Sequence, residues 1–358
     1  MKKITTITLG LLISLSSFAT VRTVNNYIAN AAQYSDLQTA INAATVGDTL
    51  LIHGTPISYG DITLNRRLCL IGAGCNLNST VNIYNTLLGS INVDTINSTP
   101  KYSISGFSMH GIQASNLNFL VVNGHPTGNK ANNVIISRCQ IGGIYPKGTN
   151  YVIKNNFIIG SVYITPNSFT SNIVISNNFI SGHINNGTSV TSYVPNVVVT
   201  NNIFTNFAGG GAQPIINGLV SNNIFINSIP SASVGSVFNK NLTYTGTVTQ
   251  LNLPPTGNTG SGNINNTNPG FINVPNPTPI STTPAFANYN FAFATTAAGY
   301  NAGTDGTNLG ITGGPYPWNG NNLDGRAQIP LMQELNINNS VINQGQQLNI
   351  EFKARKNN

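Results

Sequence analysis

The chain has 358 residues, of which 8 are Asp or Glu and 15 are Lys or Arg, so charged residues make up 6% and the formal net charge is +7. Soluble proteins contain about a quarter charged residues, so this composition excludes a helix-rich globule with a Glu/Lys surface and excludes coiled coils. Hydrophobic residues make up 40%, which is enough for a large core and argues against disorder. The composition predicts a β-rich, turn-rich protein.

The first residues have the pattern of a secretory signal peptide. Lys2 and Lys3 precede an apolar run over residues 4–18, and the small residues Ser17 and Ala19 end it. We expect residues 1–19 to be removed, so that the mature chain begins near Thr20. No run of about 18 apolar residues occurs later. The sequence thus predicts an exported protein, secreted, periplasmic or on the cell surface, without a transmembrane segment.

A short amphipathic helix is predicted next. Leu37, Ala40 and Ile41 have helical spacing behind a candidate N-cap at 35–36, and Gly47-Asp48 then leads into a predicted strand over 49–52. Exposed strand edges invite aggregation. We expect this helix to cover the open end of the repeats that follow.

One phrase recurs along the middle of the chain: two aliphatic residues, a polar residue, two positions that are mostly Asn, and an apolar residue. The intervals between the second Asn positions are 17, 22, 24, 21 and 18 residues, and a period near 20 indicates a solenoid. The β-branched, strand-length runs favour strands over helices, so each repeat is predicted to be one coil of a parallel β-helix. The second positions are Cys139, Asn156, Asn178, Asn202, Asn223 and Asn241.

Stacked coils explain the asparagines. Identical turns lie about 4.8 Å apart, so an Asn at the same turn in each coil can pass its amide hydrogen bonds to the next. Like charges at that spacing repel, which accounts for the low charge content. Loops of variable length follow each strand pair, at 182–195 and 208–214, and are natural places for a binding site. The expected columns contain Asn155, Asn177, Asn201 and Asn222, each with the residue after it.

The chain after the repeats is less regular. A stretch rich in Pro, Gly, Thr and Asn covers 254–283, and a Gly-rich run covers 303–314. Two alternating stretches within 329–352 predict a terminal hairpin or edge cover. The expected domains are the signal peptide at 1–19, the β-helix with its N-terminal cap at 20–320 with clear coils over about 100–250, and a C-terminal cap or tail at 321–358.

At these residues the chain resembles the right-handed parallel β-helix proteins of the pectin-lyase-like superfamily. The resemblance covers most of 30–320 and implies an all-β solenoid with a capping helix and a C-terminal strand extension. Lyases, glycoside hydrolases, phage tailspikes and non-catalytic surface proteins share that fold, so function must be argued from a site. The matching parts are the Asn-Asn-(Phe/Ile) repeat, the segments 37–44, 47–49 and 68–72, and the segment 303–314, which is similar to a final coil.

Carboxylates are missing from the middle of the chain. Between Asp94 and Asp305 there is no Asp or Glu. Glycoside hydrolysis ordinarily needs two carboxylates, and Ca²⁺-dependent lyases need several to hold the ion. A lyase or hydrolase would therefore have a non-standard site or one built from the terminal acids Asp61, Asp94, Asp305 and Asp324.

A metal-free lyase could use a Lys or Arg base on a uronic acid. Arg138 and Lys154 occupy neighbouring outward positions in successive coils and could approach each other, and Lys147 is a third weak candidate. The alternatives are solvated side chains or a patch for an acidic ligand. Tyrosines on the coils could stack against sugars or fill the core. The candidate ligand-binding residues are Lys130, Arg138, Lys147, Lys154, Tyr145 and Tyr163.

The favoured function is a non-catalytic glycan-binding or adhesion scaffold, with a lyase or hydrolase acting on an acidic polysaccharide as the alternative. The four histidines lack the spacing of a metal site, no Cys-x-x-Cys pair exists, and no motif for nucleic acid is present. We therefore expect neither a metal nor a cofactor. Cys69 and Cys75 are close enough for a small disulfide loop, and buried free thiols are the alternative.

Overall fold

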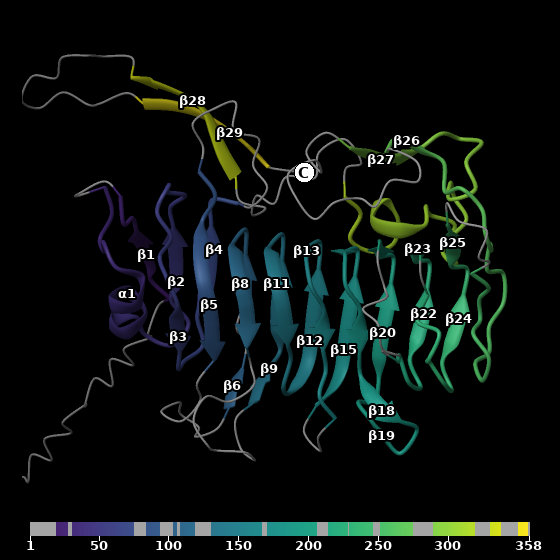
Figure 1. Cartoon of the computed structure of the whole chain (residues 1–358). Coiled ribbons are helices and arrows are strands. Elements are labelled where there is room, and N and C mark those ends of the chain that lie inside the picture. The colour runs from purple at the N-terminus through teal and green to yellow at the C-terminus, as the bar shows by residue number, and fades with distance from the viewer. Residues whose placement is uncertain are drawn as a thin grey trace, which may run out of the picture.

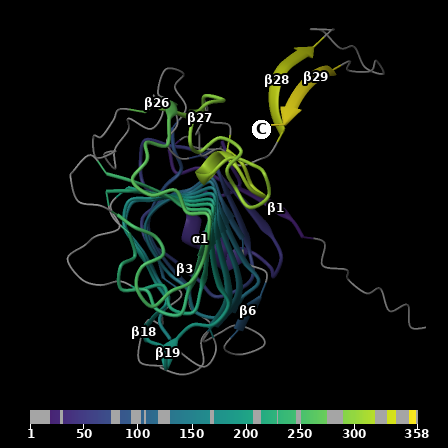
Figure 2. The same ribbon diagram turned by 90° about the vertical axis from the view of Figure 1, so that its right-hand side faces the viewer.

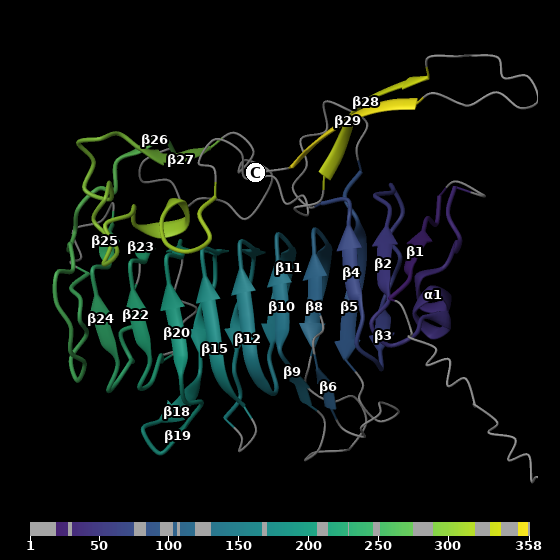
Figure 3. The same cartoon turned by 180° about the vertical axis from the view of Figure 1, so that it is seen from behind.

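In the computed structural model the chain forms a right-handed parallel β-helix, whose coils stack along one axis (Figures 1 and 3). Within the described residues, the first sheet has ten strands and the second eleven, and every strand pair in them is parallel. The predicted fold class is confirmed. The structure describes residues 19–27, 31–74, 84–93, 103–105, 108–118, 130–166, 170–205, 214–227, 229–245, 251–274, 289–318, 330–337 and 350–356.

Each coil adds a strand to one or both sheets. The first sheet contains, in spatial order, β1 (Val21–Val24), β2 (Thr49–Ile52), β4 (Cys69–Gly72), β7 (Ser108–His110), β10 (Val134–Ser137), β12 (Thr149–Lys154), β15 (Ser171–Ser176), β20 (Val197–Thr200), β22 (Leu219–Ser221) and β24 (Val237–Asn239). The second contains β3 (Ile62–Leu64), β5 (Leu87–Val93), β8 (Gln113–Asn118), β11 (Gln140–Tyr145), β13 (Phe157–Ile158), β16 (Phe179–Ile180), β21 (Ile203–Phe204), β23 (Ile224–Ile226) and β25 (Leu242–Tyr244), with β14 (Val162–Tyr163) and β17 (Ile184–Asn185) beside β11.

The core is built from columns of like residues. Side chains alternate between the two faces of a strand, so in β15 Ile173 and Ile175 are buried while Val174 faces outward. Register places Ile175 between Ile153 and Val199 in the neighbouring coils. Each coil therefore repeats the same β-branched pattern, which is why the repeat is visible in the sequence.

The turn between the two sheets explains the Asn pair. Its first residue has a φ of 53° to 59° at Asn155, Asn177, Asn201 and Asn222, and 55° at Arg138. Asn enters this left-handed region more easily than most residues, because its short polar side chain bonds locally. The first Asn of each pair thus meets a backbone requirement. The expectation that these first asparagines also pass amide bonds from coil to coil is wrong, because their side chains donate to residues 304–316 instead.

The second turn residue forms a buried ladder from Asn156 to Asn241, and the predicted column is confirmed. Each side-chain Nδ2 donates to the Oδ1 of the next coil at 2.9 to 3.1 Å, and the same Oδ1 accepts a backbone N–H at 2.9 to 3.0 Å. Cys139 begins the column by donating its backbone N–H to Asn156, and Asn263 extends it by one coil.

A second, exposed Asn ladder lies at or just before the start of four strands of the first sheet and was not predicted. Asn133, Asn150, Asn172 and Asn196 have φ values of 54° to 61°. Their amides bond along the column at 2.8 to 3.2 Å. Two turns of each coil are therefore held in register by stacked amides.

The N-terminal end of the stack is covered by α1 (Leu37–Ala43), as predicted (Figure 1). Asp36 is its N-cap and accepts the Thr39 N–H at 2.7 Å. Leu37, Ala40 and Ile41 are fully buried and belong to the main core. The helix closes the first coil with its apolar face.

The C-terminal part lies on the outer face of the second sheet. β26 (Phe271–Asn273) pairs with β27 (Asn290–Phe293), and the segment 299–318, which we call the strap, contains the 3-10 turn η3 (Gly310–Thr312). The expectation that 303–314 forms a final coil is wrong, because the strap bonds the turn residues from outside and adds no strand to either sheet. β28 (Pro330–Ile337) and β29 (Ile350–Lys356) form the predicted hairpin, and its role as cap or tail remains a prediction, as do the domain bounds.

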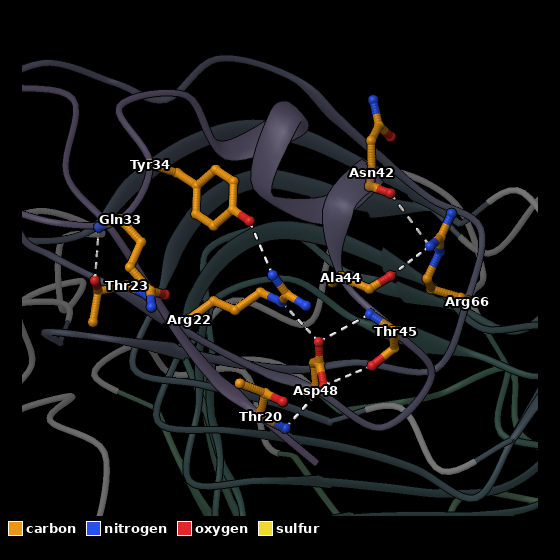
Figure 4. Close-up of polar contacts among 10 residues, drawn as sticks. All are labelled: Thr20, Arg22, Thr23, Gln33, Tyr34, Asn42, Ala44, Thr45, Asp48 and Arg66. Carbon is orange, nitrogen blue, oxygen red and sulfur yellow. Dashed lines mark hydrogen bonds and ion pairs between the residues drawn. The ribbon is translucent and has the colours of Figure 1, made fainter. Parts of the chain in front are cut away.

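Asp48 ties the first coil together (Figure 4). This fully buried carboxylate accepts hydrogen bonds from the backbone N–H of Thr20 and of Thr45, from the Thr45 hydroxyl and from Arg22 Nε, at 2.7 to 2.9 Å. Burial raises the pKa of Asp48, but the bonds to Arg22, Thr20 and Thr45 together lower it well below its ordinary value. The folded chain therefore holds Asp48 as a carboxylate.

A pH-dependent stability follows. Because the pKa of Asp48 is lower in the folded chain than in the unfolded chain, its stabilisation is present above the unfolded pKa of about 4 and is lost as pH falls toward the folded pKa. We expect the stability advantage of the wild type over Asp48→Asn in urea unfolding to shrink as pH is lowered from about 5. An advantage that stays constant through this range contradicts the assignment.

Candidate functional site

Arg138 and Lys154 approach each other at the turn between the sheets, as the sequence suggested. Lys154 ends β12 in register with Ser137, and burial and then the Arg138 charge lower the pKa of Lys154. His110 of the preceding coil bonds Ser137 Oγ through Nδ1 at 2.7 Å, and burial together with the Lys154 charge lowers its pKa to about 4. Basic groups from three coils thus meet at one corner.

The strap lies over this corner. The Lys154 ammonium is 3.9 Å from the ring centroid of Tyr316, and the Arg138 guanidinium carbon is 5.5 Å from that of Trp318. Asn155 Nδ2 donates to the Tyr316 carbonyl at 2.7 Å. Cations over aromatic faces are attracted by the ring quadrupole. The two basic side chains therefore help to hold the strap in place.

Tyr145 and Tyr163 lie at the opposite end of the second-sheet strands. Their rings are stacked, with centroids 5.3 Å apart and planes 11° from parallel. Asn185 follows Tyr163 in register one coil later, and the ring of His183 meets Tyr163 edge-on at 5.1 Å. His183 Nδ1 pairs with Ser161 Oγ at 3.1 Å, and burial lowers its pKa, so the imidazole is neutral at neutral pH.

A pocket lies beside Asn185, at the end of the row formed by Tyr145, Tyr163 and Asn185. The antiparallel hairpin β18 (Gly187–Ser189) and β19 (Ser192–Tyr193) leaves the coil directly after Asn185. Together with the next two coils it lines an open pocket of about 580 Å³, within the size range of small-ligand sites. We call Tyr145, Tyr163, Asn185 and this pocket the tyrosine face. The pocket is lined by Asn185, residues 187–190, Pro214, Ile216, Ala232 and Val234.

The two places lie on opposite sides of the coil. In Figures 1 and 2, the β18–β19 hairpin projects from one side, and β26, β27 and the strap cover the other. The candidates from the sequence therefore fall into separate groups: Arg138 and Lys154 under the strap, and Tyr145 and Tyr163 near the hairpin.

The remaining candidates have other surroundings. Lys147 is mostly buried, and burial lowers its pKa, while its carbonyl accepts the Tyr151 hydroxyl at 2.8 Å. Lys130 belongs to β9 (Lys130–Asn132), which pairs with β6 (Ser103–Ser105), and its side chain lies outside the described residues.

The terminal acids that are described lie far apart. Asp61 bonds the backbone of Ser90 in β5, whereas Asp305 lies beside Thr304, which bonds Asn222 next to β23. These two strands are six positions apart in the second sheet, or about 29 Å. Asp94 and Asp324 lie outside the described residues.

Among the residues that the structure describes, no arrangement points to a reactive cysteine or to a metal site. Cys69 and Cys139 are free thiols, and burial raises the pKa of Cys139 to about 12. In the same ranges no group of three His, Cys, Asp or Glu side chains could hold a metal ion. No helix described there is long and apolar enough to cross a membrane.

Sequence reasoning missed several residues at both places. Asn185 could have been found by aligning the second strand of each coil, because Ile144-Tyr145, Val162-Tyr163 and Ile184-Asn185 share one pattern. Tyr316 and Trp318 gave no such signal, since they belong to no repeat. They contact the coils only because the chain after the repeats folds back over them, and no local sequence pattern predicts this.

Comparisons with known proteins show no family for this chain. No protein-family profile matches the chain, and no curated protein matches it. Among solved structures, the crystal structure of the Dettilon tailspike protein is similar, with 17% identity, a TM-score of 0.28, and coverage of 62% of this chain and 54% of that chain. The chain thus spans about half the length of that protein.

Proposed function

We propose that the chain is an exported β-helix that binds a polysaccharide or cell-surface glycan at the tyrosine face, as a non-catalytic scaffold or adhesin. The observation that carries this proposal is the run of Tyr145, Tyr163 and Asn185 in register into a pocket of about 580 Å³. Tyrosine offers an apolar ring and a polar hydroxyl together, which suits the mixed surface of a sugar.

The chemistry of the pocket favours an uncharged sugar. Asn185, Thr188 and Ser189 supply amide and hydroxyl groups, Val190 and Pro214 supply apolar surface, and none of the lining residues that the structure describes carries a charge. A few polar groups in an apolar cleft are typical of small-ligand sites. The glycan we expect is therefore neutral along the part that enters the pocket.

We include export and superfamily membership in the same proposal. The pattern of residues 1–19 supports secretion, since charged, apolar and small residues follow in the order of a signal peptide. The Asn repeat and the capping helix support membership of the pectin-lyase-like superfamily in a non-catalytic branch.

Glycan-array binding of the full chain tests the function. For a neutral oligosaccharide that binds, we expect Tyr163→Ala to weaken the affinity at least about tenfold in calorimetry, because truncating a central aromatic residue costs more than about 1.4 kcal/mol. Tyr300→Ala is the control, since Tyr300 is an exposed tyrosine outside this face. Absence of binding across the array, or equal affinity of Tyr163→Ala and wild type, contradicts the proposal.

The closeness of Arg138 and Lys154 favours a second candidate, a lyase acting on an acidic polysaccharide. The lowered pKa of Lys154 suits a general base, although Tyr316 and Trp318 lie over the pair. Incubation with pectin, alginate and glycosaminoglycans tests it. Formation of unsaturated sugar ends that absorb ultraviolet light would support the lyase activity, and their absence across the whole panel would contradict it.

A further inference from the structure

Thr20 is bound to the first coil through both polar groups of its backbone, although the residue is exposed. Its N–H donates to Asp48 Oδ1 at 2.9 Å, and its carbonyl accepts the Thr49 N–H at 2.9 Å. The other Asp48 oxygen bonds Arg22 Nε at 2.7 Å (Figure 4). The nitrogen of residue 20 is therefore held against a buried carboxylate.

The residues before Thr20 have the pattern of an export-peptidase site. Ser17 and Ala19 are the small residues three positions and one position before the expected cut, and Ala19 is exposed. Hydrolysis of the Ala19–Thr20 peptide bond by such a peptidase consumes one water, leaving a carboxylate on Ala19 and an amino group on Thr20. That amino group is mostly protonated at neutral pH.

We propose that cutting after Ala19 makes Thr20 the first residue of the mature chain and that Asp48 binds its α-ammonium group. The inference rests on the export part of the proposed function and is independent of glycan binding. Processing replaces the neutral amide donor by an ammonium group, so the hydrogen bond to the Asp48 carboxylate becomes an ion pair between the same two atoms. The cut would therefore stabilise the first coil.

Other charges near the terminus modify this effect. Arg22 shares the carboxylate and repels the ammonium group, while Arg66 is engaged by the Ala44 carbonyl at 2.5 Å. Coulomb energy falls with distance and salt screens exposed charges, so the directly bonded Asp48 dominates. Among the described residues, the titratable and charged groups around the site are Arg22, Tyr34, Asp48, Arg66 and Arg67.

The first experiment identifies the terminus. The full chain is expressed in an exporting bacterial host, and the purified exported protein is analysed by intact mass and N-terminal sequencing. We expect Thr20 as the first residue. A mature protein that begins at another residue, or one that keeps residues 1–19, overturns the proposal.

The second experiment tests the ion pair without export. A chain that begins at Thr20, prepared by removing a cleavable tag, is compared with one that begins at Ala19, and each is also made with Asp48→Asn. We expect the Thr20 chain to melt about 1–3 °C higher than the Ala19 chain near pH 7, and the difference to vanish with Asp48→Asn. Equal melting, or a difference that survives Asp48→Asn, overturns the ion pair.

The pH dependence gives a readout that needs no substitution at Asp48. A carboxylate partner raises the pKa of the folded α-ammonium, so its stabilisation is complete below the unfolded value of about 8 and is lost as pH rises through the folded value. Titration of the wild-type Thr20 chain, with the α-amine followed by NMR, should give a pKa above about 8. A value at or below 8 overturns the proposal even if Asp48→Asn fails to fold.

Discussion

Replacing Asn202 by Ala should lower the free energy of unfolding by about 2–4 kcal/mol. The Asn202 amide donates to the carbonyls of Ile175 and Thr200 and to Asn223 Oδ1, and its oxygen accepts two bonds from Asn178. Asn202 is fully buried, and every one of these bonds except the one to Thr200 is buried as well, so bulk water cannot replace most of the lost partners. Ala would leave buried donors and acceptors unsatisfied in three coils. Urea unfolding followed by circular dichroism measures the loss.

The control for Asn202→Ala removes an amide from the exposed ladder. Asn196 donates to Asn172 at 2.8 Å with a φ of 56°, so Asn196→Gly keeps the backbone conformation at low cost. Water reaches the groups left behind, and we expect a change below about 1 kcal/mol. If both variants lose the same stability, burial is not what makes the inner ladder strong.

Replacing Trp318 by Ala should release the strap without unfolding the coils. Trp318 is 5% exposed, its Nε1 donates to the Asn177 carbonyl at 2.7 Å, and its ring meets Phe157 edge-on at 5.2 Å. Truncation of a buried Trp costs about 3–5 kcal/mol. Because the lost free energy is what holds the strap against the coils, we expect the rate of amide hydrogen exchange in 299–318 to rise on the order of 100-fold. Hydrogen exchange with mass spectrometry resolves the segment.

Trp318→Phe is the matched control for this release. It keeps an aromatic ring against Phe157 but removes the hydrogen bond to Asn177 and part of the buried ring, so the exchange should rise less than in Trp318→Ala, about tenfold. The apolar column under the strap, which includes Phe179 and Ile203, should become accessible in the Ala variant and bind a hydrophobic dye. An exchange rate unchanged in 299–318, or raised equally in all coils, contradicts a local docking role.

The fold could be predicted from the sequence because its main stabilising pattern is local and repeated. Each coil repeats the same turn, so the Asn pair, the flanking β-branched strands and even the substitution of Cys139 at the head of the buried ladder can be read along the chain. The capping helix followed from its apolar spacing and the N-cap at Asp36. These features depend on neighbours within one repeat and on the stacking distance between coils.

The site could be predicted only in part, because it depends on contacts between segments distant in sequence. The closeness of Arg138 and Lys154 followed from the coil spacing, but the rings of Tyr316 and Trp318 reach them across more than 150 residues. Tyr145 and Tyr163 were candidates from the sequence, yet the pocket beside Asn185 requires a hairpin to fold back over two later coils. No sequence pattern within 187–193 predicts that the hairpin folds back in this way.

The two amide columns have a consequence for how this scaffold can change. Register is fixed at the turns on either side of the first sheet, while the β18–β19 hairpin leaves the coil beyond them. A longer or different hairpin would alter the shape of the cavity without disturbing the stacking of neighbouring rungs, since loop length adds little to the entropy of closure. Replacing the β18–β19 hairpin should therefore change which ligands the pocket prefers, while the melting temperature of the β-helix stays the same.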